Sequence, residues 1–398
     1  MSHAQTIPTA LPMHSRSLVV TAVEAVSIPW TICLMVTGIT ISLIGGIWDF
    51  AWHMSIGRDT FWTPPHILVQ SGGILVGIAS IYAILTTTLS RDSEARDAAV
   101  RVLGLRGPGG AFIAIWGSLA MLASAPFDNW WHNAYGLDVQ LVTPPHGLLS
   151  LGYFATKIGA MIWMASIISR SHEVLRRRLA LLFIIVGSIC MALTLVLIIP
   201  FVFRSNMHTA QCYLAVALSI PTMMIATGRG SVHKWGCTIV AASYTTITLA
   251  SEWLLPLIPA QPKLGPVYHN VTHLIPLQFP LLLIVPALIA DLLLQRLEHR
   301  SSWTKAACIG PAFILSFLAV QWPFANFLVS QTSRNWVFGT AYFSYFDPAG
   351  FLYDPNKFEV AESTLGAFML TMLTALVVAI VTTRLGLGWG DWMRRVRR

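Results

Sequence analysis

Residues 48–66 of the chain read WDFAWHMSIGRDTFWTPPH, and residues 127–146 read FDNWWHNAYGLDVQLVTPPH. Both stretches run Asp, two residues, Trp-His, three residues, Gly, one residue, Asp, a short spacer, and Thr-Pro-Pro-His. The second copy has one additional spacer residue. Because chance does not readily repeat so many identities in the same order, we interpret the two stretches as an internal duplication.

Each copy predicts two helix ends that meet across a tight loop. The first Asp and the first His are four residues apart, so both lie on one face of a helix. The Gly opens a loop, and Thr-Pro-Pro predicts the start of a second helix, with Thr as N-cap and proline at the first helical position. The last His then falls in the first turn of that helix. The residues brought together are Asp49, His53 and His66 in the first copy, and Asp128, His132 and His146 in the second.

A carboxylate and two imidazoles form a ligand set that suits copper, zinc or iron. The alternative is a hydrogen-bonded cluster at a helix end, with the neighbouring tryptophans as anchors in the membrane interface. We favour metal binding, because the set is duplicated and because ionisable residues near membrane depth are expensive and usually functional.

Five further residues are candidates for a role at or near these sites. Asp59 and Asp138 follow the first His of each copy and can orient an imidazole, or each can simply form a loop turn. His269 and His273 are four residues apart and can add to a metal site, or they can form an interfacial pair. Glu252 lies inside an apolar stretch, where a carboxyl is a candidate ligand or part of a proton or substrate path.

The composition is that of a membrane protein. Of 398 residues, 55% are hydrophobic and only 11% are charged. The five cysteines stand singly, which argues against a disulfide framework or a thiolate metal site. Stretches near the roughly 20 residues needed to cross a bilayer predict an all-α, polytopic helix bundle of about ten transmembrane helices. The predicted spans are 28–50, 66–90, 110–130, 146–169, 179–203, 208–228, 235–257, 271–294, 306–331 and 362–384.

Lys and Arg gather in alternate connections, which predicts the topology. The even-numbered connections and the C-terminal tail are rich in them, whereas the odd-numbered connections hold only Arg58, Arg204, Lys263, Arg334 and Lys357. This asymmetry predicts cytoplasmic N and C termini and places both repeated motifs near the outer, periplasmic or extracellular face of the cell membrane. The net charge of +8 is then a topology signal and does not indicate binding to nucleic acid.

We therefore expect four regions along the chain. Residues 1–27 form a cytoplasmic tail, and 28–170 form a duplicated, metal-binding four-helix unit. Residues 171–385 form a six-helix membrane unit that includes an aromatic outer loop, 332–361. Residues 386–398 form a basic cytoplasmic tail.

The first motif resembles the copper site of the membrane C subunit of the particulate methane and ammonia monooxygenases. That site has the form Asp, three residues, His, twelve residues, His, which Asp49, His53 and His66 match. The family also has Arg-Asp-Thr between the histidines, and residues 58–60 read the same. The resemblance implies that these three ligands hold copper.

The second motif resembles a second site in the same subunit, of the form Asn, three residues, His, thirteen residues, His. Asp128, His132 and His146 share its spacing, with Asp in place of Asn. The two motifs occur in the family's order, and the resemblance covers roughly residues 28–170. The six later spans have no counterpart in that subunit, and the soluble copper domain carried by one of the family's partner subunits is absent from the chain.

The resemblance implies a copper-dependent membrane monooxygenase, or its metal-bearing subunit, that activates O₂ at Asp49, His53 and His66 to oxidise a small apolar substrate. It also implies other membrane or periplasmic subunits as partners, beside the lipid bilayer. Zinc or iron fits the ligands about as well as copper. The main alternative is a membrane metal transporter or metal-delivery protein. A structural subunit of an electron-transfer complex is a weaker one, because no paired mid-helix histidines for haem stand out.

Overall fold

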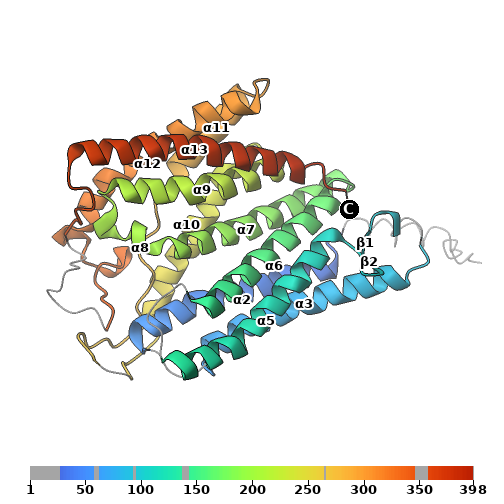
Figure 1. The fold of residues 1–398 in the computed structure, drawn as a ribbon, viewed down its shortest axis with the longest axis horizontal. Helices are drawn as coiled ribbons and strands as arrows, with labels where there is room; N and C mark the ends of the chain where they lie inside the picture. Colours follow the sequence, from blue (N-terminus) through green and yellow to red (C-terminus); the bar gives the residue numbers. More distant parts are fainter. Residues whose placement is uncertain are drawn as a thin grey trace, which may run out of the picture.

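The computed structural model describes residues 27–57, 62–92, 96–136, 143–263, 266–345 and 357–397. Helices make up most of this part of the chain (Figure 1). Eight of them are long and apolar enough to cross a bilayer, so the chain is a multi-pass membrane helix bundle. They are α2 (Trp30–Ser55), α3 (Pro64–Leu89), α5 (Gly109–Tyr135), α6 (Pro144–Ile168), α7 (Glu173–Leu197), α9 (Ala210–Gly230), α12 (Ser302–Leu328) and α13 (Leu365–Met393).

The remaining elements are short. A two-stranded antiparallel hairpin, β1 (Val100–Val102) with β2 (Leu105–Gly107), lies between α3 and α5 and was not expected from the sequence. Thr88 of α3 holds it in place, because its hydroxyl donates to the Arg106 carbonyl and accepts from the Arg106 N–H. The other elements are α8 (Ile199–Val202), α10 (Gly236–Leu254), α11 (Ile284–Arg296), η1 (Arg204–Asn206), η2 (Leu255–Leu257), η3 (Gln331–Ser333) and η4 (Trp336–Phe338). Of the predicted aromatic outer loop, residues 346–356 lie outside the described residues.

Two of the ten predicted spans differ from the structure. The span 235–257 forms α10, a helix of 19 residues that falls outside the group of eight. The prediction of a continuous span over 271–294 is wrong, because helical structure there begins only at α11. Pro276 and Pro280 explain the interruption, since each removes a backbone donor and its ring clashes with the preceding turn of a helix. The structure thus supports eight of the ten spans within the described residues.

The duplication extends beyond the motifs into the helix packing. Gly38 of α2 faces Gly72 of α3, and a Cβ at Gly38 would lie 2.6 Å from the Gly72 carbonyl oxygen. Gly117 of α5 faces Gly152 of α6 in the same way, with a Cβ 2.9 Å from the Gly152 oxygen. In each pair, the first glycine lies eleven residues before the motif's first Asp, and the second glycine lies six residues after the motif's last His. Each repeat is therefore a helical hairpin whose two helices touch along their backbones.

Helix α7 lies between the two repeats and the rest of the bundle (Figure 1). Its buried Leu179 and Phe183 belong to the hydrophobic core of the N-terminal helices, whereas Ile184 and Cys190 belong to the core formed with α9–α13. The last turns of α2 and α5 and the first turns of α3 and α6 lie at one end of the bundle, and the β hairpin and the C-terminal end of α13 lie at the other (Figure 1). This relative arrangement agrees with the alternation of the charged connections. The orientation with cytoplasmic termini stays a prediction.

Candidate metal centres

Each repeat ends its first helix and begins its second in the manner that the sequence predicts. In the second repeat, α5 ends at Tyr135, and Gly136 follows with a φ of +86°. Helix α6 then begins with two prolines after Thr143, whose side chain accepts a hydrogen bond from the His146 N–H at 3.4 Å. The first repeat has the equivalent glycine, Gly57, at a φ of +101°. Thr63 takes the N-cap position there, but its hydroxyl forms no hydrogen bond.

The first set of candidate ligands converges on one carboxylate oxygen. Asp49 Oδ1 lies 2.9 Å from His66 Nε2 and 3.5 Å from His53 Nε2. The two imidazole rings are 5.9 Å apart between centroids and tilted by 50°. The three side chains are 21–30% exposed, so they are half-buried at the end of the hairpin.

The second set repeats this geometry on α5 and α6. Asp128 Oδ1 lies 3.4 Å from His132 Nε2 and 3.5 Å from His146 Nε2. In both sets the three ligand atoms lie within 4.8 Å of one another. A tetrahedral ion with bonds of about 2.0–2.1 Å separates its ligand atoms by about 3.3 Å. Both sets are therefore close to the size of a first-row metal site.

In each cluster two imidazole nitrogens face one aspartate oxygen. Oδ1 of Asp49 and Oδ1 of Asp128 are buried, and two imidazole nitrogens lie within 3.5 Å of each. Ligands of one ion likewise aim their lone pairs at a shared point. A buried carboxylate is costly by itself, and a bound cation would offset that cost.

In His53 and His132, the ring nitrogen that points away from the carboxylate, Nδ1, faces a glycine carbonyl. His53 Nδ1 lies 3.4 Å from the Gly57 oxygen, and His132 Nδ1 lies 3.2 Å from the Gly136 oxygen. An Nδ1–H that donates to a carbonyl leaves Nε2 unprotonated and facing the carboxylate, which is the form that binds a metal. The positive φ of both glycines turns their carbonyls back toward the histidines. This role was not predicted from the sequence, although the glycine repeated in both motifs was a signal for it.

The two sets are neighbours in space. Asp49 of the first repeat lies close enough to His146 of the second repeat for their charges to interact, and Tyr153 of α6 donates a hydrogen bond to the Ser42 carbonyl of α2 at 3.0 Å.

The two sets of ligands have different surroundings on the side away from the bundle. Segments from the C-terminal half cover the end of α2, where the Lys263 N–H donates to the Ile56 carbonyl at 2.9 Å.

An aromatic cluster adjoins the second set. Phe127 and Trp131 meet edge to face, and the Trp131 ring lies 4.5 Å from that of Tyr135. Trp130 stacks on Phe127 and is half exposed. These rings present apolar surface directly beside the ligands of α5.

The other candidates do not join either set. His269 stacks on Phe343, and His273 is exposed, with its ring beside the Thr272 hydroxyl. Glu252 is buried at the end of α10 and belongs to neither ligand group. Asp59 and Asp138 lie outside the described residues.

Comparison of the chain with family models, curated proteins and solved structures gives no match. Two nitrogens and one carboxylate oxygen per set fit a borderline transition metal such as copper, zinc or iron, and the ligand set does not distinguish among the three.

Proposed function

We propose that the chain holds two transition-metal ions, one in each Asp-His-His set. We further propose that it acts as a copper-dependent membrane monooxygenase, or as the metal-bearing subunit of one. The observation that carries the metal sites is the duplicated convergence of two Nε2 atoms on a buried Asp Oδ1. Copper and the oxygenase reaction rest on the resemblance of the motifs to the particulate monooxygenase subunit.

A fixed site is favoured over a transport path by the distribution of ligands. Both Asp-His-His groups lie at the same end of the bundle, and the described residues contain no third group that would continue a path across it. A transporter needs ligands at successive depths, whereas an oxygenase needs one rigid site. The contacts of His53 with the Gly57 carbonyl and of His132 with the Gly136 carbonyl supply that rigidity.

The surroundings of the second set suit a small apolar substrate. Three protein ligands leave coordination positions for O₂, and a copper ion in such a site supplies the redox chemistry that O₂ activation needs. The Asp and His side chains hold the ion, and the glycine carbonyls keep the first imidazoles in one orientation. Phe127, Trp130 and Trp131 form an apolar surface beside the site, along which a substrate can approach. In the family that the motifs resemble, further subunits are required, and we include membrane or periplasmic partners in the proposal.

The test separates the oxygenase from the transporter. The full-length protein is purified with its co-purifying subunits, loaded with copper in nanodiscs, and given a reductant, O₂ and either short hydrocarbons or ammonia. We expect substrate-dependent oxygen consumption that is lost in His53→Ala and retained in His273→Ala, an exposed histidine outside both sets. In parallel, proteoliposomes report metal entry. Metal uptake that requires His53, without oxygen consumption by the same preparation, would overturn the oxygenase in favour of a transporter.

A further inference from the structure

A buried carboxyl lies at each end of helix α10, one from α11 and one from α10 itself, and the two have opposite surroundings. At its N-terminus, Asp291 of α11 is only 2% exposed. Its oxygens accept hydrogen bonds from the Cys237 N–H at 3.1 Å and from the Thr238 N–H and hydroxyl at 2.8 and 2.7 Å. Asp291 therefore accepts three hydrogen bonds at the positive end of the helix dipole.

Glu252 stands at the opposite end of the same helix, two residues before its last residue, Leu254. Its exposed fraction is 0%, and neither of its oxygens accepts a hydrogen bond. A Cβ at Gly339 would lie 2.5 Å from Glu252 Oε1, so the carboxyl packs directly against that backbone. The negative end of the helix dipole disfavours a carboxylate here. An isolated carboxylate in such surroundings is strongly disfavoured relative to the neutral acid.

The groups that face Glu252 do not neutralise it by contact. The nearby titratable or charged residues are Arg204 of η1, Tyr244 of α10 and Tyr342 of the segment after η4. Arg204 acts on Glu252 through its charge, but neither Glu252 oxygen is hydrogen-bonded to it. Tyr244 accepts the Leu281 N–H at 3.1 Å.

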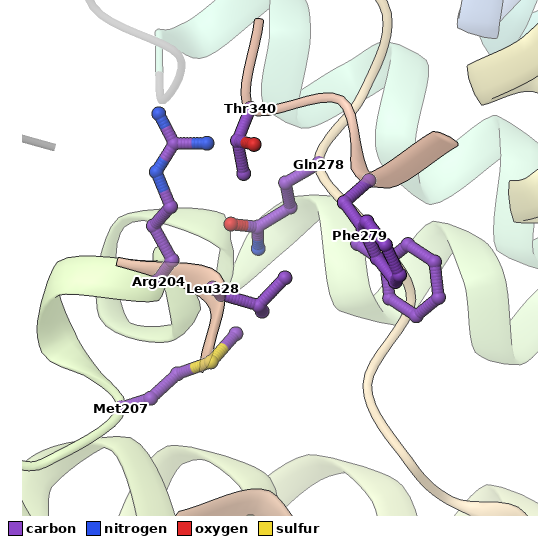
Figure 2. A pocket seen from close by; sticks show the side chains of 7 residues that line it. Arg204, Met207, Gln278, Phe279, Leu328 and Thr340 are labelled. Carbon is purple, nitrogen blue, oxygen red and sulfur yellow. The ribbon is translucent and has the colours of Figure 1, made fainter. Parts of the chain in front are cut away.

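A small cavity lies at the interrupted span, next to Gly339, the residue that Glu252 contacts (Figure 2). It lies beside the two residues that flank Gly339, and Gln278 enters it from the extended segment between Pro276 and Pro280. The amide of Gln278 donates to the Val202 carbonyl at 2.8 Å, while its oxygen is buried and accepts no hydrogen bond. The lining residues are Arg204, Met207, Gln278, Phe279, Leu328, Phe338 and Thr340. Non-helical backbone of this kind within a membrane protein is tolerated where it is buried or lines a cavity.

We propose that Glu252 is a proton-binding site, which holds a proton in the resting protein and exchanges it through the cavity at the interrupted span. A proton fits the surroundings better than a metal cation. Hard cations such as Ca²⁺ take about six to eight oxygen ligands, whereas a proton needs one. The positive charge of Arg204 also repels a metal ion. The proposal is independent of the two metal centres.

Labelling with dicyclohexylcarbodiimide tests the protonated state. This apolar reagent modifies protonated carboxyls in apolar surroundings, and peptide mass spectrometry locates the modification. We expect the full-length protein in nanodiscs to be labelled at Glu252 at neutral pH, with loss of labelling at strongly alkaline pH and in Glu252→Gln. Asp291 is the internal control, because it is equally buried but its oxygens accept three hydrogen bonds, so we expect it to stay unlabelled.

Three outcomes would overturn the proposal. The first is an unlabelled Glu252 together with an infrared spectrum in which Glu252→Gln removes no protonated-carboxyl band. The second is equal labelling of Asp291 and Glu252. The third is labelling that Na⁺ blocks at constant pH, which would show a metal cation at the site.

The route through the cavity has its own test. In Gln278→Leu an apolar side chain replaces the polar one that enters the cavity, while Glu252 is left intact. We expect the infrared band of the Glu252 acid to exchange in D₂O at least several-fold more slowly in this variant, with the same final extent of labelling. An unchanged exchange rate would refute the route.

Discussion

Substitution of Gly136 by alanine tests how the second metal centre is held. Gly136 has φ +86° and ψ 173°, a region that is essentially restricted to glycine. A Cβ at this position would meet no atom within 4 Å, so the substitution creates no clash and its effect is confined to the backbone. Relief of the strain rotates the carbonyl away from His132 Nδ1, now 3.2 Å distant.

The size of the effect follows from that strain. A non-glycine residue in this region costs about 1–3 kcal/mol. If the metal-bound form retains the strain and the metal-free form relaxes, the affinity of the second site falls roughly 5- to 150-fold, since 1.4 kcal/mol is tenfold. This range agrees with the roughly 10- to 100-fold losses that follow removal of a partner that orients a metal-binding histidine.

The affinity is measured by chelator competition in a His66→Ala background, which leaves the second site to be observed alone. Gly147→Ala is the matched control. It also meets no atom within 4 Å, but it lies within helix α6 beside His146, where alanine is tolerated. We expect unchanged affinity for this control. A Gly136→Ala protein that binds the second ion as tightly as its parent would refute the carbonyl's role in orienting His132.

Three further predictions concern the bundle. Gly38→Val should lower stability by about 1–3 kcal/mol, because its Cβ would approach the Gly72 oxygen to 2.6 Å; an unchanged melting temperature in detergent would contradict the close helix contact. Lys157→Met should raise stability by about 1 kcal/mol, because the buried amine has no hydrogen-bond partner and lies only over the Tyr153 ring, 4.3 Å from its centroid; a lower melting temperature would show that this cation–π contact outweighs the cost of burying the amine. Reporter fusions should place loop 91–108 in the cytoplasm and loop 132–143 outside; a cytoplasmic report from the second loop would reverse the topology.

The candidate metal centres were predictable because their determinants are local. Asp49 and His53 are one helical turn apart, and the paired prolines fix where the next helix begins, so that His66 arrives opposite them. The repeat also predicts the second set of ligands. The repeated sequence contains a further signal, which concerns the packing of the helices. Gly38 and Gly117 occupy equivalent positions in the two copies, and this equivalence identifies the helix contact.

Other features depend on contacts between residues distant in sequence. Asp291 binds the N-terminus of α10, although more than fifty residues separate it from Cys237 and Thr238, and no motif indicates the pairing. The interrupted span had a local signal in Pro276 and Pro280, but its apolar composition outweighed that signal in a hydropathy argument. The absence of His273 from the metal sites also has a tertiary cause. It lies opposite Pro259 in an isolated antiparallel bridge within the described residues, with its side chain exposed.

Metal content tests the central claim most directly. The full-length protein, loaded with copper and freed of loosely bound ions, is analysed by mass spectrometry for metal per chain and by electron paramagnetic resonance for nitrogen ligation. We predict two ions per wild-type chain, one in His53→Ala, one in His132→Ala and none in the double variant, with resolved coupling to imidazole nitrogen wherever a site remains. A double variant that retains both ions would contradict the account.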